Sequence, residues 1–407
     1  MTERRVRVLH LICGLGGGGS ERWLRDIVRL SLDRLEHKVI PVYPQGLMDF
    51  VHSDELHAMS AYKPPRSLPP SLRQPLVRLR SDSLRLPPPI RSVARGAASA
   101  PALGHAVLVA RRFRPHVLHS HTAPDFLVSL AVSMLLRIPL VHTVPCLFSQ
   151  LRAAGYGWIP TLYARAHPAV ALFSTGEGRA ELEAVGVPSR KILYDLGGVD
   201  VRAADAFLAE REAHYAAVRR RLNLAANCPL LLTVARLDPS KGHILGVEAL
   251  PAMLQDVPDL HWVVLGEGEQ RRHLEDRARE LGVADRLHLL GFVPDPRSYQ
   301  AAAALYLHTA LFEPENFSYY EAMAMGLPLV GFDTGERPDL LHTGGHGLQA
   351  PRGDVAAFAR AAVTLLQMPD RGRSIGARGF AYARRHLDLS GSVARLSQVY
   401  SDLARRP

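Results

Sequence analysis

The feature that most constrains the fold of this chain is a repeated order of apolar strand, short loop and amphipathic helix. Val6–Cys13 is a continuous apolar run, 14–19 is a glycine-rich loop, and Ser20–Leu32 has apolar residues near a helical period. Strands that alternate with helices pair in parallel, and such sheets bind ligands at the carboxyl ends of their strands. The repeat therefore predicts an α/β fold of doubly wound parallel sheets. The later strands that it predicts are His116–His119, Leu140–Val144, Val170–Phe173, Leu230–Ala235, His261–Leu265, Leu287–Leu290 and Leu305–Leu311.

The repeat starts again after Gly197–Asp200, which divides the chain into two halves of similar size. A chain of 407 residues is also longer than one hydrophobic core usually supports. We therefore expect two Rossmann-like domains facing a central, ligand-binding cleft. The predicted ranges are 1–203 and 204–407, with a last helix that is able to cross back to the first domain.

The composition of the chain indicates its cellular compartment and bears on disulfides, metal sites and membrane spans. Its three cysteines are too few and too scattered for a disulfide framework, and none has a metal-ligand spacing with another Cys or His. The first apolar stretch ends in glycines and not in a cleavage site, and the most apolar window, Phe126–Val144, contains an arginine and a proline. We expect a cytoplasmic protein with no membrane-spanning helix and no bound metal.

The formal net charge of +10 is concentrated in the segment 63–114. This segment has eleven Lys and Arg residues against one acid, Asp82, so its excess equals that of the whole chain. Paired and tripled prolines predict an irregular insertion in the N-terminal domain. Two interpretations stay open: a solvated loop, or an electropositive surface for an anionic partner or an acidic membrane face. Nucleic acid is not favoured, because no aromatic residues are interleaved with these charges.

The glycine-rich loop 14–19 satisfies the dinucleotide pattern G-x-G-x-x-G between a strand and a helix. A nicotinamide enzyme also needs an acid at the end of its second strand, but Val39–Tyr43 is followed by proline and glutamine. The signal for a nicotinamide cofactor is therefore weak. The loop serves either as a tight turn or as backbone that closely approaches a phosphate or a sugar.

Two cations, Arg236 and Lys241, flank a loop after the predicted strand Leu230–Ala235. A diphosphate has about two negative charges, and without a metal such a pair of cations is the available counter-charge. Cations five residues apart are also common on solvated surfaces. The position at the end of a strand is what favours a binding role.

Two carboxylates, Glu313 and Glu321, are separated by a turn between a predicted strand and the helix that starts at Ser318. Carboxylates accept hydrogen bonds in pairs, as sugar hydroxyls and a ribose diol require. Ser318 and Glu321 also have the spacing of a capping box, which would stabilise the helix without any ligand. That alternative accounts for neither Glu313 nor Asn316.

These motifs occur together in an order and spacing that resemble the retaining glycosyltransferases of family 4, which are glycogen-synthase-like group 1 glycosyltransferases. The resemblance spans nearly the whole chain. It implies the GT-B fold of two Rossmann-like domains. It also implies transfer of a hexosyl group from a nucleotide-diphosphate sugar to a hydroxyl acceptor, with retention at the anomeric carbon and no metal or other cofactor. The motifs that carry it are Gly18–Arg22, Arg114–His121, Arg236-x₄-Lys241-Gly242, Gly266-x-Gly268, Gly291–Pro294, Glu313-x₇-Glu321 and Gly326–Val330.

The resemblance also implies residue roles, with the nucleotide sugar on the C-terminal domain and the acceptor on the N-terminal domain. Glu313 would bind a hydroxyl group of the donor sugar and is, with His121, a candidate catalytic residue. The leaving phosphate oxygen would take the proton of the acceptor, so no protein base is implied. The implied substrate-binding residues are Gly18 and Gly19 for sugar and phosphate, Arg236 and Lys241 for the diphosphate, Gly266, Val293 near the base, Asn316 and Phe317 through their backbone, and Glu321 for the ribose.

One departure affects the catalytic histidine. Many members of the family have a histidine where this chain has Pro145, three residues after His142. His121, at the end of the preceding strand, and His142 are the remaining candidates for that role.

Two alternatives to a transferase stay open. A sugar phosphorylase or nucleotide-sugar epimerase of the same fold would use inorganic phosphate or no acceptor, and a noncatalytic subunit would bind donor without consuming it. For the transferase, the basic segment is consistent with a nucleotide-sugar donor and an anionic or lipid-linked acceptor. It is also consistent with peripheral association at the inner face of the membrane.

Overall fold

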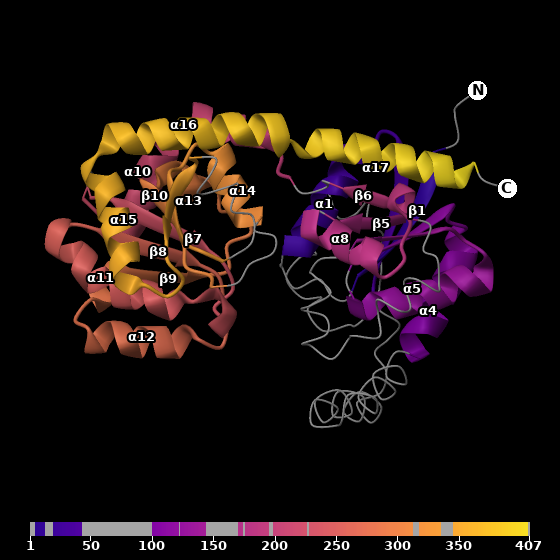
Figure 1. Ribbon diagram of the computed structural model, residues 1–407, viewed down its shortest axis with the longest axis horizontal. Helices are drawn as coiled ribbons and strands as arrows, with labels where there is room; N and C mark the ends of the chain where they lie inside the picture. Colours follow the sequence, from indigo (N-terminus) through magenta and orange to yellow (C-terminus); the bar gives the residue numbers. More distant parts are fainter. Residues whose placement is uncertain are drawn as a thin grey trace. The chain divides into compact units, whose positions relative to one another are not determined.

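The computed structural model describes residues 5–12, 19–42, 100–121, 123–143, 170–173, 176–194, 198–225, 228–311, 317–334 and 345–405 (Figure 1). Contacts divide the chain into unit 1, residues 1–196 with 390–407, and unit 2, residues 197–389. The predicted division at 203/204 falls inside helix α9 (Val201–Ala209). Contacts place the division earlier because Val199 donates to the carbonyl of Leu387 (2.8 Å) and accepts from the amide of Leu389 (3.0 Å).

Unit 1 contains a parallel sheet with the strand order β2-β1-β3-β4-β5-β6. Its strands are β1 (Val6–Ile12), β2 (Leu35–Pro41), β3 (Val117–Ser120), β4 (Leu140–Thr143), β5 (Val170–Phe173) and β6 (Ile192–Tyr194). Its described helices are α1 (Gly19–Ser31), α4 (Ala100–Phe113), α5 (Ala123–Leu136), α8 (Gly176–Ala184) and α17 (Leu389–Ala404). The first residue of α17, Leu389, is counted with unit 2.

The two faces of the unit 1 sheet have different coverings. Leu9 and Leu11 of β1 belong to a core that includes residues of α4 and α5, whereas Ile12 packs with Leu24 of α1. Successive residues of a strand point to opposite faces, so His10 lies on the same face as Ile12. The apolar period of β1 therefore places one polar side chain beneath α1.

Unit 2 contains a second parallel sheet, with the strand order β12-β11-β10-β7-β8-β9. Its strands are β7 (Leu230–Val234), β8 (His261–Leu265), β9 (Leu287–Gly291), β10 (Leu305–His308), β11 (Leu329–Phe332) and β12 (Gly347–Ala350). Its α-helices, besides α9, are α10 (Arg211–Leu222), α11 (His243–Asp256), α12 (Arg271–Glu280), α13 (Arg297–Ala302), α14 (Phe317–Ala324), α15 (Val355–Gln367) and α16 (Pro369–His386). The strands predicted in this half are thus present, with small shifts at their ends.

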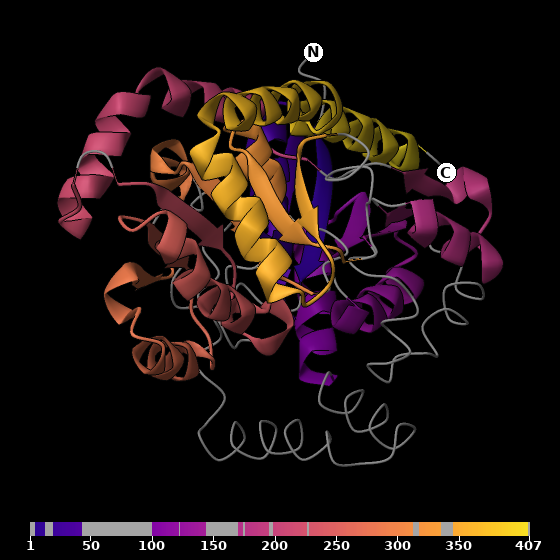
Figure 2. The ribbon, with the colours of Figure 1, turned by 60° about the vertical axis from the view of Figure 1, so that its left-hand side comes forward.

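Helices cover both faces of this sheet, which explains why its strands are continuous apolar runs. Residues of α9, α10, α13 and α14 share one core with the sheet, and residues of α11, α12 and α15 share the other. Figure 1 shows α11 and α12 on one side of the strands and α10 and α13 on the other. Figure 2 shows α15 lying across the strands of its half, in agreement with its contacts to β10, β11 and β12.

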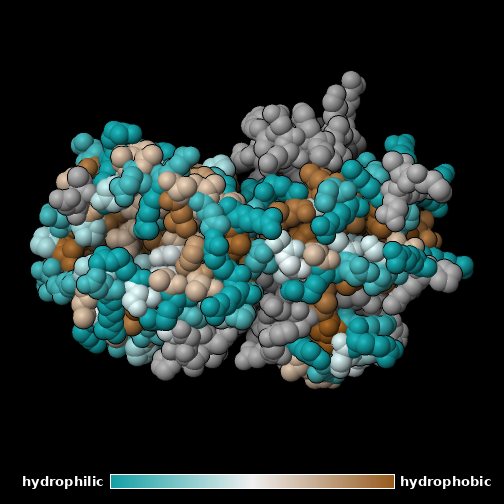
Figure 3. All heavy atoms as spheres, turned by 90° about the horizontal axis from the view of Figure 1, so that it is seen from above, coloured by the Kyte–Doolittle hydropathy of each residue, from teal (hydrophilic) through white to brown (hydrophobic). Residues whose placement is uncertain are grey.

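Helix α16 approaches the turn after α14 very closely. Gly372, Gly376 and Gly379 lie on its buried side, and its outer side, which has exposed arginines, is mainly hydrophilic in Figure 3. A Cβ atom at Gly376 would lie 2.2 Å from the carbonyl oxygen of Gly326. At Gly379 the nearest atom would be 3.7 Å away, an ordinary contact. None of the described helices combines the length and hydropathy that a membrane span requires.

We expect Gly376→Ala to lower the free energy of unfolding by about 1–3 kcal/mol, because the methyl group forces α16 away from the turn. Gly379→Ala is the matched control in the same helix. There the better helix propensity of alanine should leave stability unchanged or raise it by up to about 1 kcal/mol. Urea denaturation of both variants measures the difference, and equal stabilities would contradict the close contact.

Candidate active site

The loop after β7 presents the predicted cation pair. Asp238 begins the short 3-10 helix Pro239–Lys241 and accepts from the amide of Ser240 (3.0 Å). Nη2 of Arg236 lies 3.0 Å from Oδ2 of Asp238, and 68% of the arginine side chain is exposed. The guanidinium is therefore held near the loop by one carboxylate while most of it faces solvent.

The same loop is fastened to the end of β10. The hydroxyl of Thr309 donates to the carbonyl of Lys241 (2.7 Å), and Nε2 of His243 donates to the carbonyl of Arg236 (3.0 Å). Gly242 adopts a left-handed conformation (φ 59°), and a Cβ atom there would lie 2.3 Å from the carbonyl oxygen of Thr309. Burial, and then the charges of Lys241 and His243, lower the pKa of the neighbouring His308 to about 3. Lys241 is thus placed at the carboxyl edge of β10.

Glycines bring the loops after β7 and β8 together. A Cβ atom at Gly266 (φ 155°) would lie 1.9 Å from the carbonyl oxygen of Ala235, and one at Gly268 would lie 2.2 Å from that of Leu237. The amide of Gly266 also donates to Gly291 at the end of β9 (2.8 Å). Backbone packing alone therefore requires glycine at 266, which the sequence had suggested as a substrate-binding residue.

The remaining described residues of the predicted set lie at the same edge. Val293 follows β9, is partly buried and packs against the core. Phe317 is the first residue of α14, and its ring packs against that of Tyr320 (centroids 6.1 Å apart). Oε2 of Glu321 accepts from Nε2 of the buried Gln300 (3.4 Å). Helix α14 starts at Phe317, one residue before the predicted start, so Ser318 and Glu321 both lie within the helix. Glu313, Asn316, Gly18 and Pro145 lie outside the described residues.

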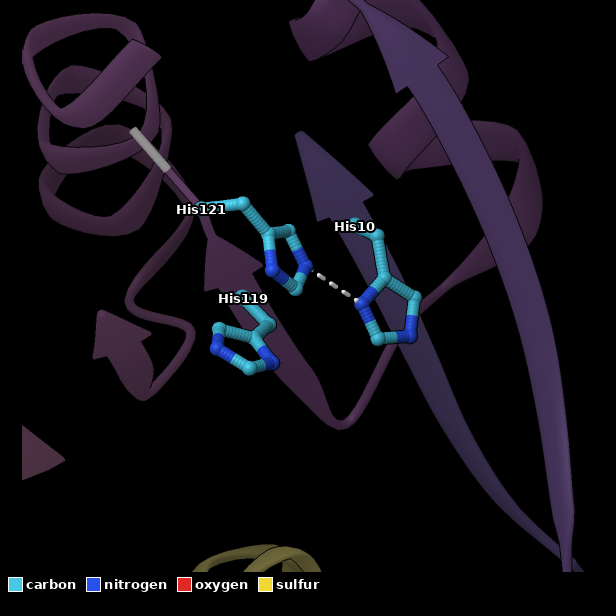
Figure 4. Close-up of side chains that lie close together, drawn as sticks. All are labelled: His10, His119 and His121. Atoms are coloured by element: carbon cyan, nitrogen blue, oxygen red, sulfur yellow. Dashed lines mark hydrogen bonds between the residues drawn. The ribbon is translucent and has the colours of Figure 1, made fainter. Parts of the chain in front are cut away.

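In unit 1, His121 follows β3 directly and is 1% exposed. Its amide donates to the side chain of Asp125 (2.7 Å), and Nε2 of its ring lies 2.9 Å from Nδ1 of His10 (Figure 4). The ring of His119 lies beside it, with centroids 4.0 Å apart, and is bonded to Tyr400 of α17 (2.5 Å) and Thr143 (2.9 Å). His121 is therefore part of a buried histidine cluster that we define as His10, His37, His119 and His121.

The cluster has a geometry that a metal bound by imidazole groups could use, although the sequence predicted no metal site. One ring nitrogen from each of His10, His119 and His121 lies within 4.8 Å of the others. Five of the six nitrogens of these rings, however, are already in hydrogen bonds. A metal held by all three residues would break at least two of them, so the described arrangement is a hydrogen-bonded network.

Burial keeps the cluster neutral at neutral pH. It lowers the pKa of His121 to about 3 and that of His37 to about 4. Burial, together with the neighbouring histidines, holds the pKa values of His10 and His119 well below their usual range. His142, the other candidate for a catalytic histidine, is also buried with a lowered pKa, and its Nδ1 lies 2.5 Å from the hydroxyl of Ser120. It lies on the opposite face of the sheet from His119.

Several residues of these arrangements were missed by sequence reasoning. Thr309 and His243, which hold the loop of Arg236 and Lys241, gave no signal because their contacts depend on the pairing of β7 with β10. His119, in contrast, could have been found from the sequence. It lies two residues before His121, and residues two apart in a strand point to the same face.

The family described as "Glycosyl transferases group 1" matches residues 228–368, the region that contains the loop of Arg236 and Lys241. The lipopolysaccharide core biosynthesis glycosyltransferase LpsE of Rhizobium meliloti is 30% identical over 35% of this chain and 41% of its own length. The D-inositol 3-phosphate glycosyltransferase of Thermobispora bispora is 28% identical over 56% of this chain and 55% of its own. The chain spans about half the length of the curated relatives it matches.

Solved structures resemble the chain over nearly its whole length. HepE of Anabaena, in complex with UDP and glucose, has a TM-score of 0.74 at 19% identity, with 98% of this chain and 100% of that chain covered. WaaG, a glycosyltransferase involved in lipopolysaccharide biosynthesis, has a TM-score of 0.67 at 15% identity, with 97% and 99% covered. The fold is therefore the predicted GT-B fold, with two parallel-sheet α/β domains.

We expect the histidine cluster to make unfolding easier in mild acid. The pKa values of His37 and His121 are lower in the folded state than the ordinary value of 6.5, so the unfolded chain binds more protons below pH 6.5. Stability should therefore fall as the pH decreases from 6.5, by about 2 kcal/mol for each of the two residues at pH 5. Urea denaturation at pH 7 and pH 5 tests this. His121→Asn should lose about 2 kcal/mol less than wild type between these values; an equal loss would contradict it.

Proposed function

We propose that this chain is a retaining, metal-independent glycosyltransferase that moves a hexosyl group from a nucleotide-diphosphate sugar to a hydroxyl acceptor. The observation that carries the proposal is the loop after β7, in which Arg236 and Lys241 lie at the carboxyl edge of the sheet. The loop is anchored through its backbone carbonyls by Thr309 and His243, and most of the Arg236 side chain faces solvent. Its position inside the matched family region supports the same assignment.

Arg236 and Lys241 bind the diphosphate in this proposal. They are preorganised donors that stabilise the negative charge that develops on the departing phosphate, and this stabilisation needs no metal. Glu321 accepts hydrogen bonds from the ribose diol, and Glu313 binds a hydroxyl group of the donor sugar. The proton of the acceptor goes to the leaving phosphate oxygen, so the enzyme needs no protein base.

His121 is the histidine of unit 1 that we assign to the sugar. Its pKa of about 3 makes it neutral at neutral pH, so it acts as a hydrogen-bonding group and not as a cation. Its position at the end of β3 is the carboxyl edge of a parallel sheet, where ligands of such folds bind. It takes the role that Pro145 cannot fill.

We expect Lys241→Ala and Arg236→Ala each to lower turnover of the nucleotide sugar by about 10²-fold to 10³-fold, the scale for losing one charge-stabilising donor. Arg279→Ala is the control, because that side chain is 62% exposed in the last turn of α12, at the end of the helix opposite the loop after β8. Release of UDP or GDP from UDP-glucose and GDP-mannose, with and without acceptors, is the measurement. EDTA should have no effect.

Three outcomes of that experiment would contradict the proposal. Loss of activity in EDTA and its return with Mg²⁺ would show a metal requirement. Turnover that requires inorganic phosphate would indicate a phosphorylase, and turnover that needs no acceptor would indicate an epimerase. Binding of donor without any turnover would indicate a noncatalytic subunit.

We further propose an anionic or lipid-linked acceptor and peripheral membrane association. The segment 63–114 carries the whole positive excess, and its described end lies on α4. There the 47% exposed Leu108 shares a helix face with the exposed Arg111 and Arg112. An apolar residue beside cations suits the surface of an anionic leaflet, where each Lys or Arg contributes about 1 kcal/mol.

Cosedimentation with anionic liposomes at low and high salt tests this association. We expect wild type to pellet at low salt and to be released at high salt, because the attraction is electrostatic. A variant with Arg73, Arg78, Arg80 and Arg85 changed to Gln should remain in the supernatant. Salt-independent recovery of both proteins in the supernatant would contradict the proposal and favour a soluble acceptor.

A further inference from the structure

A chain of hydrogen bonds connects helix α1 to His121 through the histidine cluster. The hydroxyl of Ser31, in the last turn of α1, donates to the carbonyl of Ile27 (2.6 Å). Its oxygen lies 2.9 Å from Nε2 of His37, whose Nδ1 lies 2.8 Å from Nε2 of His10. Nδ1 of His10 lies 2.9 Å from Nε2 of His121. The chain thus passes through three rings, and every one of them is buried.

The first bond of this chain fixes the direction of all the others. A serine hydroxyl has one proton, and that of Ser31 is used on Ile27, so Nε2 of His37 must donate to Ser31. A neutral imidazole has one N–H, so Nδ1 of His37 accepts from Nε2 of His10. By the same step Nδ1 of His10 accepts from Nε2 of His121. The Nδ1 atom of His121 is left with a lone pair and no proton.

This Nδ1 atom is buried and has no hydrogen-bond partner in the part of the chain that the structure describes. A buried acceptor without a partner is destabilising and rare in folded proteins, so a ligand that completes the bond would account for it. An acceptor of this kind binds the O–H group of a sugar and rejects a carbonyl or a phosphate oxygen, which offer no proton. The cluster therefore ends in a group that is selective for a hydroxyl.

We propose that Ser31, His37 and His10 are positioning residues that lock His121 in the tautomer protonated on Nε2, so that its Nδ1 accepts a hydrogen bond from a hydroxyl group of the donor sugar. The proposal rests on the transferase function proposed above. His119 lies beside the chain but outside it, because its two nitrogens are bonded to Tyr400 and Thr143. A buried ring next to His121 thus offers a matched control.

The tautomer is measured directly, without any substrate, by long-range ¹⁵N–¹H correlation spectra of the protein labelled at its histidines. In wild type we expect the nitrogen shifts of His121 to show a protonated Nε2 and an unprotonated Nδ1. Ser31→Ala removes the acceptor that sets the direction, so a mixture of both tautomers should appear at His121. Tyr400→Phe removes a hydrogen bond of His119 at similar burial and should leave the tautomer of His121 unchanged. Thermal melting confirms that each variant is folded.

The effect on the sugar is measured as the Kd of a nucleotide sugar against the Kd of the free nucleotide, with UDP-glucose and UDP or GDP-mannose and GDP. Ser31→Ala and His10→Phe should raise the Kd of the nucleotide sugar by about twofold to threefold, because only the fraction of His121 with an unprotonated Nδ1 accepts the hydroxyl group, and leave that of the nucleotide unchanged. Tyr400→Phe should change neither. A wild-type His121 protonated on Nδ1, or equal sugar affinities in wild type and Ser31→Ala, would overturn the inference. Wild type that binds no nucleotide would instead reject the proposed function and its sugar ligand, while the spectra still report the tautomer.

Discussion

Parallel pairing is the constraint on which the rest of the structure depends. Each sheet is covered by helices on both faces, so most residues within its central strands are apolar; Leu230, Leu231 and Leu232 of β7, for example, are all 0% exposed. Polar side chains within the strands must bond to one another, as His10 and His119 of unit 1 do with their neighbours, and the others lie where strands end. All strands of a sheet run in one direction, so the segments that follow them collect at a single edge. Residues as distant in sequence as Arg236 and Glu321 reach the same edge for this reason.

Backbone contacts between the loops then determine the shape of that edge. Gly242 and Gly266 allow carbonyl oxygens of neighbouring segments to approach where a side chain would collide. Thr309 and His243 bond to the carbonyls of the cationic loop. The loop is therefore fastened through its backbone, while Arg236 pairs with Asp238 and keeps 68% of its side chain exposed.

The sequence predicted the α/β class, most strands of both sheets and the end of the strand after which the cations lie, because these follow from local hydrophobic period and loop position. It missed the short strands β6, β11 and β12. It placed the start of α14 at Ser318, one residue after the observed start at Phe317. It also missed the histidine cluster as a unit. His10, His37 and His119 are distant in sequence, and only the register of β1 with β2 and β3 shows that they share a face. Residues that hold loops in place, such as Thr309, were missed for the same reason, since strand order determines their partners.

Arg236 and the histidine cluster satisfy their polar groups in opposite ways, and this determines how far a local change travels. Arg236 is largely exposed, so its pairing with Asp238 is screened by water and its loss is felt locally. The histidines of the cluster are buried and neutral, and each ring has a single proton to share. When one neighbour fixes that proton, the opposite nitrogen of the same ring becomes an acceptor, and the next ring must donate. A hydroxyl group at the end of α1 therefore governs the chemistry of a nitrogen three rings away, through bonds that water does not interrupt.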